Sequence, residues 1–197
     1  MQKHGRIDIL VNNVGRSAPG DPASLSEEEW DDQIAINLKS VYLMTHLVLP
    51  VMEAQTTGGC ALNISSIAGL RYVGKPQVGY AAAKAAIRQF TRTTAVIYAQ
   101  RTQGRVRLNT VVPGLIATPL VSVLANKYAG PDADETAYRR TRDLQVPTGK
   151  MGTAWDVAHA ALYLCSEEAG YVTGAEIVVD GGIVGSTGFT VEELAKL

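Results

Sequence analysis

This sequence contains few cysteines, almost no excess of positive or negative charge, and few long apolar runs. Its 197 residues include only two cysteines, Cys60 and Cys165, and no CxxC or His/Cys cluster, so neither a disulfide scaffold nor a zinc site is expected. The net charge of −1 argues against a nucleic-acid partner. Neither a secretory signal nor a window of about 18 apolar residues is evident, so we expect a cytoplasmic protein without a membrane span.

Short apolar runs alternate with longer helical patterns along the chain. The expected strands are 7–11, 60–64, 106–112 and 176–179, and the expected helices are 26–50, 80–100 and 154–166. Strands that alternate with helices of ten or more residues predict a parallel sheet with right-handed crossovers. Because no internal repeat or linker is visible, we expect one doubly wound α/β domain over 1–197, or part of one.

The chemistry-bearing motifs follow the expected strands. The segment NNVG (12–15) follows the first strand, Ser65 and Ser66 follow the second, and the segment 113–118 follows the third. Ligands of doubly wound sheets bind outside the carboxyl ends of the strands. We therefore expect one site at this edge of the sheet.

Tyr80 and Lys84 form the strongest local pair of candidate catalytic residues. Residues i and i+4 share one face of a helix, so the two side chains can converge. A free tyrosine has a pKa of about 10, and a neighbouring ammonium group would favour the phenolate and lower that pKa. Ser66 could donate a hydrogen bond to a substrate oxygen on which charge develops. Alone, however, a YxxxK pattern is more often a surface pair on a helix.

Several motifs occur together in a fixed order: NNVG, IAINLKS, NISSIAG, YAAAK, NTVVPGLIAT and VTGAEIVVDGG. Together they resemble the short-chain dehydrogenase/reductase family, in the branch that carries NNAG and YxxxK motifs, over about residues 5–182. The resemblance implies a Rossmann-like fold. It also implies an NAD(P)-dependent oxidoreductase that transfers hydride between nicotinamide and a ketone or secondary alcohol. NADP is expected over NAD on family frequency alone.

The resemblance implies a catalytic set of Asn37, Ser66, Tyr80 and Lys84. Tyr80 would exchange a proton with the substrate, and Lys84 would lower the pKa of Tyr80 and hold the nicotinamide ribose. Ser66 would orient the substrate oxygen. Asn37 would hold a helix kink and a water that relays protons through Lys84. Ser65 stays a second candidate for the serine role, because Ser66 precedes Tyr80 by 14 positions, one more than the family spacing.

The implied cofactor-binding residues follow the strands or begin the next helix. They are Asn13, Val14, Gly15, Tyr80, Lys84, Pro113, Gly114, Ile116 and Thr118. Segment 120–150 would form a substrate lid with an apolar face of Leu120, Val121, Leu124 and Tyr128. Low charge at this lid suggests a neutral small-molecule carbonyl or alcohol substrate, such as a polyketide, terpenoid or sugar-derived ketone, in secondary metabolism or catabolism.

Other polar and sulfur-containing residues are interpreted as structural. Asn12 and Asn63 are expected to brace loops and strand edges, and His159 to be packed or solvated. Cys60 and Cys165 are expected to be buried small apolar residues.

The glycine-rich turn TGxxxGxG, which begins the family and cradles the pyrophosphate, does not occur in this sequence. Strand 7–11 would consequently be an exposed apolar edge. Three explanations stay open: a native protein longer by roughly 70–90 residues, an inactive truncated paralogue that acts only as a dimerisation partner of full-length relatives, or a partner chain that completes the sheet. A homodimer or homotetramer is expected through the helices that carry Asn37 and Tyr80. The NNVG and DGG motifs disfavour a related dehydratase or epimerase.

Overall fold

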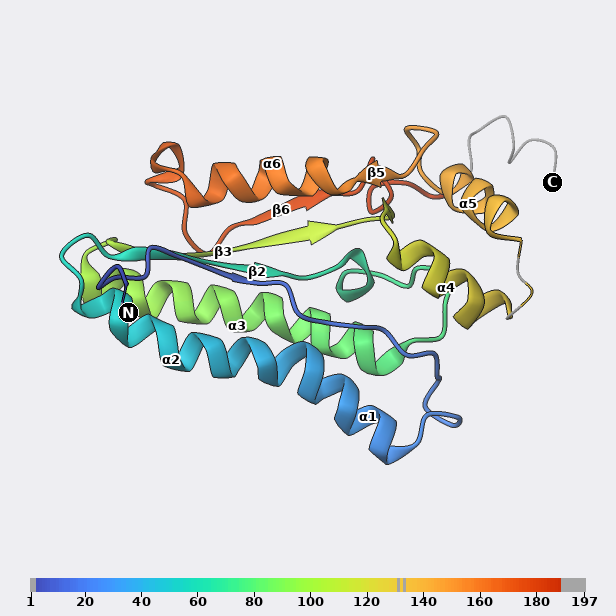
Figure 1. Ribbon diagram of the computed structural model, residues 1–197, viewed down its shortest axis with the longest axis horizontal. Helices are drawn as coiled ribbons and strands as arrows, with labels where there is room; N and C mark the ends of the chain where they lie inside the picture. The colour runs from blue at the N-terminus through green and yellow to red at the C-terminus, as the bar shows by residue number, and fades with distance from the viewer. Residues whose placement is uncertain (1–2, 131, 133, 189–197) are drawn as a thin grey trace.

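The computed structural model describes residues 3–130, 132 and 134–188, and a four-stranded sheet lies at its centre. The strands are β1 (Ile9–Asn12), β2 (Gly59–Ile64), β3 (Val106–Pro113) and β6 (Glu176–Val179). They are parallel and stand in the order β1-β2-β3-β6. In Figure 1, α2 and α3 cover one face of this sheet and α6 covers the other. The predicted α/β fold with a parallel sheet is confirmed.

Six α-helices are assigned in the part of the chain that the structure describes: α1 (Glu27–Ile34), α2 (Ser40–Ala54), α3 (Val78–Thr102), α4 (Leu120–Ala129), α5 (Glu135–Leu144) and α6 (Ala154–Cys165). Short elements complete the chain: a π-helical turn η1 (Ala35–Lys39), 3-10 turns η2 (Ile67–Gly69) and η3 (Glu167–Ala169), and a two-stranded sheet of β4 (Ile116–Ala117) and β5 (Gly152–Thr153). The two-stranded sheet was not predicted. It forms between residues that are distant in the sequence.

Helix α1 begins where the sequence predicts and passes through η1 into α2. Ser26 caps α1 by accepting a hydrogen bond from the Glu29 amide, and acidic residues fill the first turn, where the helix dipole favours them. The predicted end at Pro50 is wrong, because α2 continues to Ala54. Proline removes one backbone donor from a helix. Here the apolar side chains on either side of Pro50, Leu49 and Met52, are fully buried and hold the helix on the sheet.

The continuous helical segment Glu27–Ala54 is long and apolar enough to cross a membrane by length and composition alone. The prediction that no such window exists is therefore wrong. The same test is passed by core helices of proteins that have no membrane span, so it is weak evidence for one. In this structure α2 packs against the sheet through Val41, Thr45 and Val48.

Helix α3 packs on the sheet with one face. Ala83, Ile87, Thr91 and Ala95 recur at four-residue intervals, and all of them are buried. Small side chains at 83 and 95 let the helix approach the strands closely. The helix ends at Thr102 and is followed by its C-cap, Gln103, which adopts the left-handed conformation.

Among the described residues, two apolar core clusters pack on the sheet, one on each face, and a third consists of Val121, Val146 and Met151. The first contains Leu10, Val48, Leu49, Met52, Ala61, Ala95, Val106 and Leu108, and the second contains Leu62, Val111 and Leu164. Two consecutive side-chain hydrogen bonds link buried residues of β1, β2 and α3. Asn12 donates to Asn63 at 2.8 Å, and Asn63 donates to Thr91 at 2.8 Å. The predicted bracing role of the two asparagines is confirmed.

Strand β1 is an edge of the sheet. Within the described residues it pairs with β2 alone, and the side chains of Ile9 and Val11 are about half exposed (50% and 51%). The expected apolar edge is therefore present, although the strand begins at Ile9 rather than at Ile7. Helices α4 and α5 lie beyond the carboxyl ends of the strands in Figure 1, over the edge where the site is expected.

Candidate active site

A cavity of about 450 Å³ opens at the carboxyl ends of strands β1, β2 and β3. Nearly all the residues that the sequence predicts for the site line it: Asn13, Gly15, Ser66, Tyr80, Lys84, Pro113, Gly114, Ile116 and Thr118, together with the second serine candidate, Ser65. Two predicted residues are not part of the lining. Val14 is 64% exposed outside the cavity, and Asn37 is fully buried behind it.

Lys84 is a buried cation held beside Tyr80. Its Nζ atom donates a 2.8 Å hydrogen bond to the Ile64 carbonyl oxygen at the end of β2, and lies 5.6 Å from the centre of the Tyr80 ring. The two side chains therefore share one face of α3, as their spacing predicts. Burial lowers the pKa of Lys84 to about 8. Below that pH the ammonium form predominates.

Asn37 lies in the π-helical turn and ties it to the loop after β1. Its side-chain amide donates to the carbonyl oxygens of Gln33, at 2.9 Å, and Arg16, at 3.0 Å. Its Oδ1 atom accepts a 3.1 Å bond from the Arg16 amide. A helix distortion at Asn37 is thus present, as expected, and the side chain positions backbone rather than facing the cavity. The proton-relay water stays a prediction.

Gly15 lies close to the side chains of both Asn37 and Lys84. A Cβ atom at this position would lie 2.6 Å from the Asn37 Oδ1 atom and 3.3 Å from the Lys84 Nζ atom. Space, not backbone strain, therefore requires glycine here, because a side chain would displace both Asn37 and Lys84.

The two serines after β2 have different hydrogen bonds. The Ser65 hydroxyl is buried and donates to the Lys84 carbonyl oxygen at 2.7 Å, so it fastens β2 to α3. The Ser66 hydroxyl accepts a 3.2 Å bond from the Ala68 amide and caps the 3-10 turn η2. An accepting contact does not use the Ser66 O–H, which can still donate to a ligand. This difference favours Ser66 over Ser65 for the serine role.

The loop after β3 is held close to the last strand. The Gly114 amide donates to the Val179 carbonyl oxygen at 2.9 Å, and a Cβ on Gly114 would lie 2.6 Å from the Asp180 Cα atom. Ile116 then enters the β4–β5 sheet by pairing with Gly152. These contacts fix the backbone on which Pro113, Ile116 and Thr118 face the cavity.

The cavity is more cationic than the sequence predicts. Lys75 and Arg142 both line it, from the loop before α3 and from α5. The Lys75 Nζ atom lies 3.1 Å from the Tyr138 hydroxyl, and the Arg142 guanidinium lies 5.7 Å from the centre of the Tyr138 ring. Burial and the charge of Arg142 lower the pKa of Lys75 to about 8. One cation of the expected lid segment, Arg142, thus lines the cavity, so the lid carries more charge at this point than expected. A neutral substrate stays a prediction.

The structure describes only two of the four apolar side chains that the sequence predicts for the lid. Leu120 and Val121 line the cavity. The side chains of Leu124 and Tyr128 lie outside the described residues. Lys75, Tyr138 and Arg142 were missed because no local motif links a loop before α3 to a helix more than sixty positions further on.

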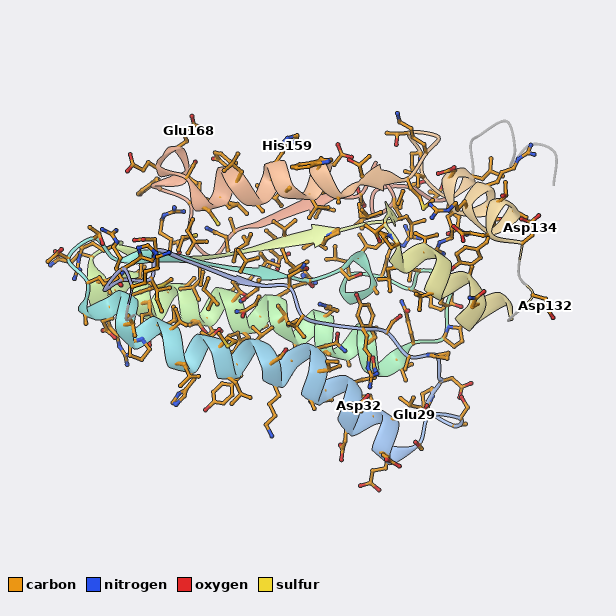
Figure 2. The ribbon with its side chains drawn as sticks, viewed as in Figure 1. Glu29, Asp32, Asp132, Asp134, His159 and Glu168 are labelled. Atoms are coloured by element: carbon orange, nitrogen blue, oxygen red, sulfur yellow. The ribbon has the colours of Figure 1, made fainter. Side chains whose placement is uncertain are left out.

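Acidic, cysteine and histidine side chains do not gather at the site. Among the residues that the structure describes, no group of three or more could hold a metal ion. Figure 2 shows His159 and Glu168 on the outer side of the α6 region, and Asp132 and Asp134 at the far end beside α5. His159 is exposed, which agrees with its interpretation as a solvated residue.

The sequence is similar to a family model and to several known proteins. A family model described as enoyl-(acyl carrier protein) reductase matches residues 1–184. A 3-oxoacyl-(acyl-carrier-protein) reductase FabG of Thermotoga maritima is 41% identical over 184 residues, which are 93% of this chain and 69% of the relative. A cyclopentanol dehydrogenase of Comamonas testosteroni is 41% identical over 180 residues, which are 90% of this chain and 66% of the relative.

A solved structure agrees in three dimensions. The ligand-free aldohexose dehydrogenase of Thermoplasma acidophilum superposes with a TM-score of 0.88 at 30% identity, over 96% of this chain and 72% of that one. The parallel sheet and the cavity at its carboxyl edge define a Rossmann-like α/β protein. The chain belongs to the short-chain dehydrogenase/reductase family of oxidoreductases. It spans about two thirds of the length of the curated relatives described above.

Proposed function

We propose that the protein is an NAD(P)-dependent oxidoreductase that transfers hydride between nicotinamide and a ketone or secondary alcohol. The observation that carries this proposal is the convergence of Ser66, Tyr80 and Lys84 on one cavity at the carboxyl edge of the sheet. The names of two relatives support it, because one is a dehydrogenase of cyclopentanol, a secondary alcohol, and the other is a dehydrogenase of aldohexoses. A role in secondary metabolism or catabolism, a single domain over 1–197 and a cytoplasmic location stay predictions.

The proposed roles are those that the family resemblance implies, and the positions of the side chains in the cavity support them. The Tyr80 hydroxyl donates its proton to the substrate oxygen in reduction and takes it back in oxidation. The Ser66 O–H holds the same oxygen and stabilises the charge that develops on it. The Lys84 ammonium group, beside the Tyr80 ring, stabilises the phenolate that results. Asn37 is a positioning residue, which holds the Arg16 backbone and the π-helical turn.

The residues present fit the nicotinamide half of a dinucleotide, which supplies or accepts the hydride when it is bound. Gly15 lacks the Cβ atom that would displace Lys84, so the ammonium group can reach ribose hydroxyls. Asn13 and Val14 precede it on the same loop, and Pro113, Gly114, Ile116 and Thr118 line the cavity from the end of β3 onward. NADP is proposed over NAD on family frequency.

Cofactor binding tests the proposal directly. In a fluorescence titration of the 197-residue chain with NADPH and NADH, we expect saturable binding by the wild-type protein. Gly15→Ala should weaken that binding by about tenfold or more, since one lost or displaced charged hydrogen bond costs on the order of 1.5–3 kcal/mol. The new Cβ would lie 2.6 Å from the Asn37 Oδ1 atom.

Gly185→Ala is the matched control for this titration. Its backbone is not in the left-handed region, and the nearest atom to a new Cβ is 3.8 Å away. Its affinity for the cofactor should equal that of the wild-type protein. Absence of binding by the wild-type chain at millimolar cofactor would refute the proposal that this chain is itself an enzyme.

The second candidate function is a non-catalytic subunit that acts only by self-association. Large apolar side chains are exposed on the outer faces of α2 and α3: Tyr42, Leu43, Met44, Leu47, Val96 and Ile97. Burial of such a patch stabilises an interface by roughly 25 cal/mol per Å² of apolar surface. Self-association without cofactor binding would favour this candidate, whereas both together would favour the enzyme.

We accordingly propose a homodimer or homotetramer formed through α2 and α3. Light scattering should give a mass of at least twice the 21.0 kDa of one chain. Leu47→Asp, which places a charge in the exposed apolar face of α2, should shift the protein toward the monomer. Tyr171→Asp, an apolar-to-acid change at a fully exposed side chain beyond α6, should not. A monomeric wild-type protein, or equal masses for the two variants, would contradict the proposed interface.

A further inference from the structure

Cys60 and Cys165 lie side by side, although they are 105 positions apart in the sequence. Their Sγ atoms are 3.9 Å apart, and the Cys60 thiol lies 3.4 Å from the Leu164 carbonyl oxygen. Cys60 is the second residue of β2 and is buried, whereas Cys165 is the last residue of α6 and is partly exposed. Cys60 is therefore buried, as predicted, whereas Cys165 is only partly buried and packs against the second apolar cluster.

Arg107 creates an electropositive environment at the pair. It stands beside Cys60 in the register of β3 with β2, and its guanidinium donates to the carbonyl oxygens of Leu164 and Ser166 at 2.9 and 3.0 Å. The hydrogen bond with Cys60 and the charge of Arg107 lower the pKa of Cys165 to about 7, although burial opposes this shift. The same hydrogen bond, together with burial, raises the pKa of Cys60. Cys165 is therefore the better nucleophile of the two.

We propose that Cys60 and Cys165 are a reversible thiol–disulfide pair that hydrogen peroxide oxidises. The Cys165 thiolate attacks one oxygen of the peroxide, the O–O bond breaks, and the products are a sulfenic acid and a hydroxide that takes up a proton to become water. The Cys60 sulfur then attacks the sulfenic sulfur. An S–S bond forms, the S–O bond breaks, and the departing hydroxide leaves as a second water with the Cys60 proton. Two thiols thus lose two electrons, and the peroxide gains them.

The surroundings of the pair permit closure. The sulfurs must approach from 3.9 Å to the bond length of about 2.04 Å. Cys60 is fixed in the sheet, since its neighbours in register are Ile9 on β1 and Arg107 on β3. Cys165 lies where α6 ends, because Ser166 already has extended backbone geometry. A small shift of the last turn of α6 therefore brings the sulfurs together.

The pair is independent of the proposed hydride-transfer site. Cys60 lies at the amino end of β2, while Ser65 and Ser66 follow its carboxyl end. The disulfide would instead join β2 to α6 across 105 positions of the chain, and such a link stabilises a fold mainly by restricting the unfolded chain.

Mass spectrometry of the full 197-residue chain tests this inference. The reduced protein, freed of reductant, is treated with hydrogen peroxide, and the remaining thiols are then blocked with N-ethylmaleimide. We expect an intact mass two hydrogens below that of the reduced chain, no maleimide adduct and a linked peptide that contains Cys60 and Cys165. Dithiothreitol should restore both thiols. Maleimide adducts on both cysteines after oxidation, a link between two chains, or irreversible oxygen adducts on Cys165 would overturn the proposal.

Single-cysteine variants separate the two roles. Cys60→Ser should stop at the sulfenic acid on Cys165, which dimedone traps, whereas the wild-type protein should give little dimedone adduct. Cys165→Ser should leave Cys60 unmodified, because Cys60 is buried and burial by itself raises the pKa of its thiol. Equal dimedone labelling of the wild-type and Cys60→Ser proteins would show that Cys60 does not resolve the sulfenic acid. The result on the wild-type chain holds whether or not either variant folds.

Discussion

Replacing Tyr80 with phenylalanine is expected to lower kcat/KM for ketone reduction by about 10³-fold, because a positioned proton donor contributes roughly 10²–10⁴ to a rate. The change removes one hydroxyl from the cavity wall and leaves the ring beside Lys84. The affinity for NADPH should stay within about tenfold of the wild-type value, since the change removes at most one neutral hydrogen bond to the cofactor, which contributes roughly 0.5–1.5 kcal/mol. The measurement is steady-state oxidation of NADPH with small ketones, together with a cofactor titration.

Tyr98→Phe is the matched control for this result. Tyr98 lies on the same helix, is partly buried and has a cationic neighbour, Arg101, 5.5 Å from its ring. It is far from the cavity lining, so the rate should not change. A Tyr80→Phe protein that keeps more than a tenth of the wild-type activity would exclude Tyr80 as the proton donor.

Replacing Lys84 with methionine is expected to change activity and stability in opposite directions. Activity should fall by about 10²-fold or more, because the phenolate loses its neighbouring cation. Stability at pH 7 should rise, because the charge of Lys84 is buried at 4% exposure and its pKa is lowered by burial from 10.5 to about 8. Such a shift corresponds to roughly 3 kcal/mol of unfavourable charge burial. Losing the bond to the Ile64 carbonyl oxygen offsets about 1–2 kcal/mol of that gain.

The stability difference between Lys84→Met and the wild-type protein should depend on pH. Between the pKa of about 8 in the folded protein and the ordinary value of 10.5, the unfolded chain binds the lysine proton and the folded chain does not. The wild-type protein therefore becomes more stable as the pH rises through this window. The advantage of the variant is consequently complete below about pH 8 and is lost toward pH 10.5. Lys75 titrates near the same pH in both proteins and cancels in the difference.

Urea denaturation of both proteins at pH 7 and pH 10 measures this effect. Lys39→Met is the control, because Lys39 is an exposed lysine in the π-helical turn, and its removal should alter neither stability nor rate by much. A Lys84→Met protein that is less stable than wild type at pH 7, or whose stability difference does not vary with pH, would show that the ammonium group is not a buried destabilising charge.

The sequence predicted much of the candidate site, because its residues belong to short motifs. Each motif follows a strand or begins a helix, so the parallel arrangement of the strands brings Gly15, Ser66, Tyr80 and Pro113 to one edge. The i, i+4 spacing of Tyr80 and Lys84 similarly places both on one helix face. These inferences need only local geometry and the direction of the strands. Local signals were less reliable at Pro50, where buried neighbours continue a helix that proline would otherwise end.

The amino-acid pattern was therefore sufficient to predict the α/β fold, the family and the residues that reach the carboxyl edge of the sheet. Only the tertiary structure showed which serine O–H can donate to a ligand and why Gly15 has no room for a side chain. It also showed that two cations line the cavity and that Cys60 and Cys165 meet. The physical reason is common to these cases. Contacts between residues far apart in the chain depend on how helices pack on the sheet, and that packing has no period or motif in the sequence.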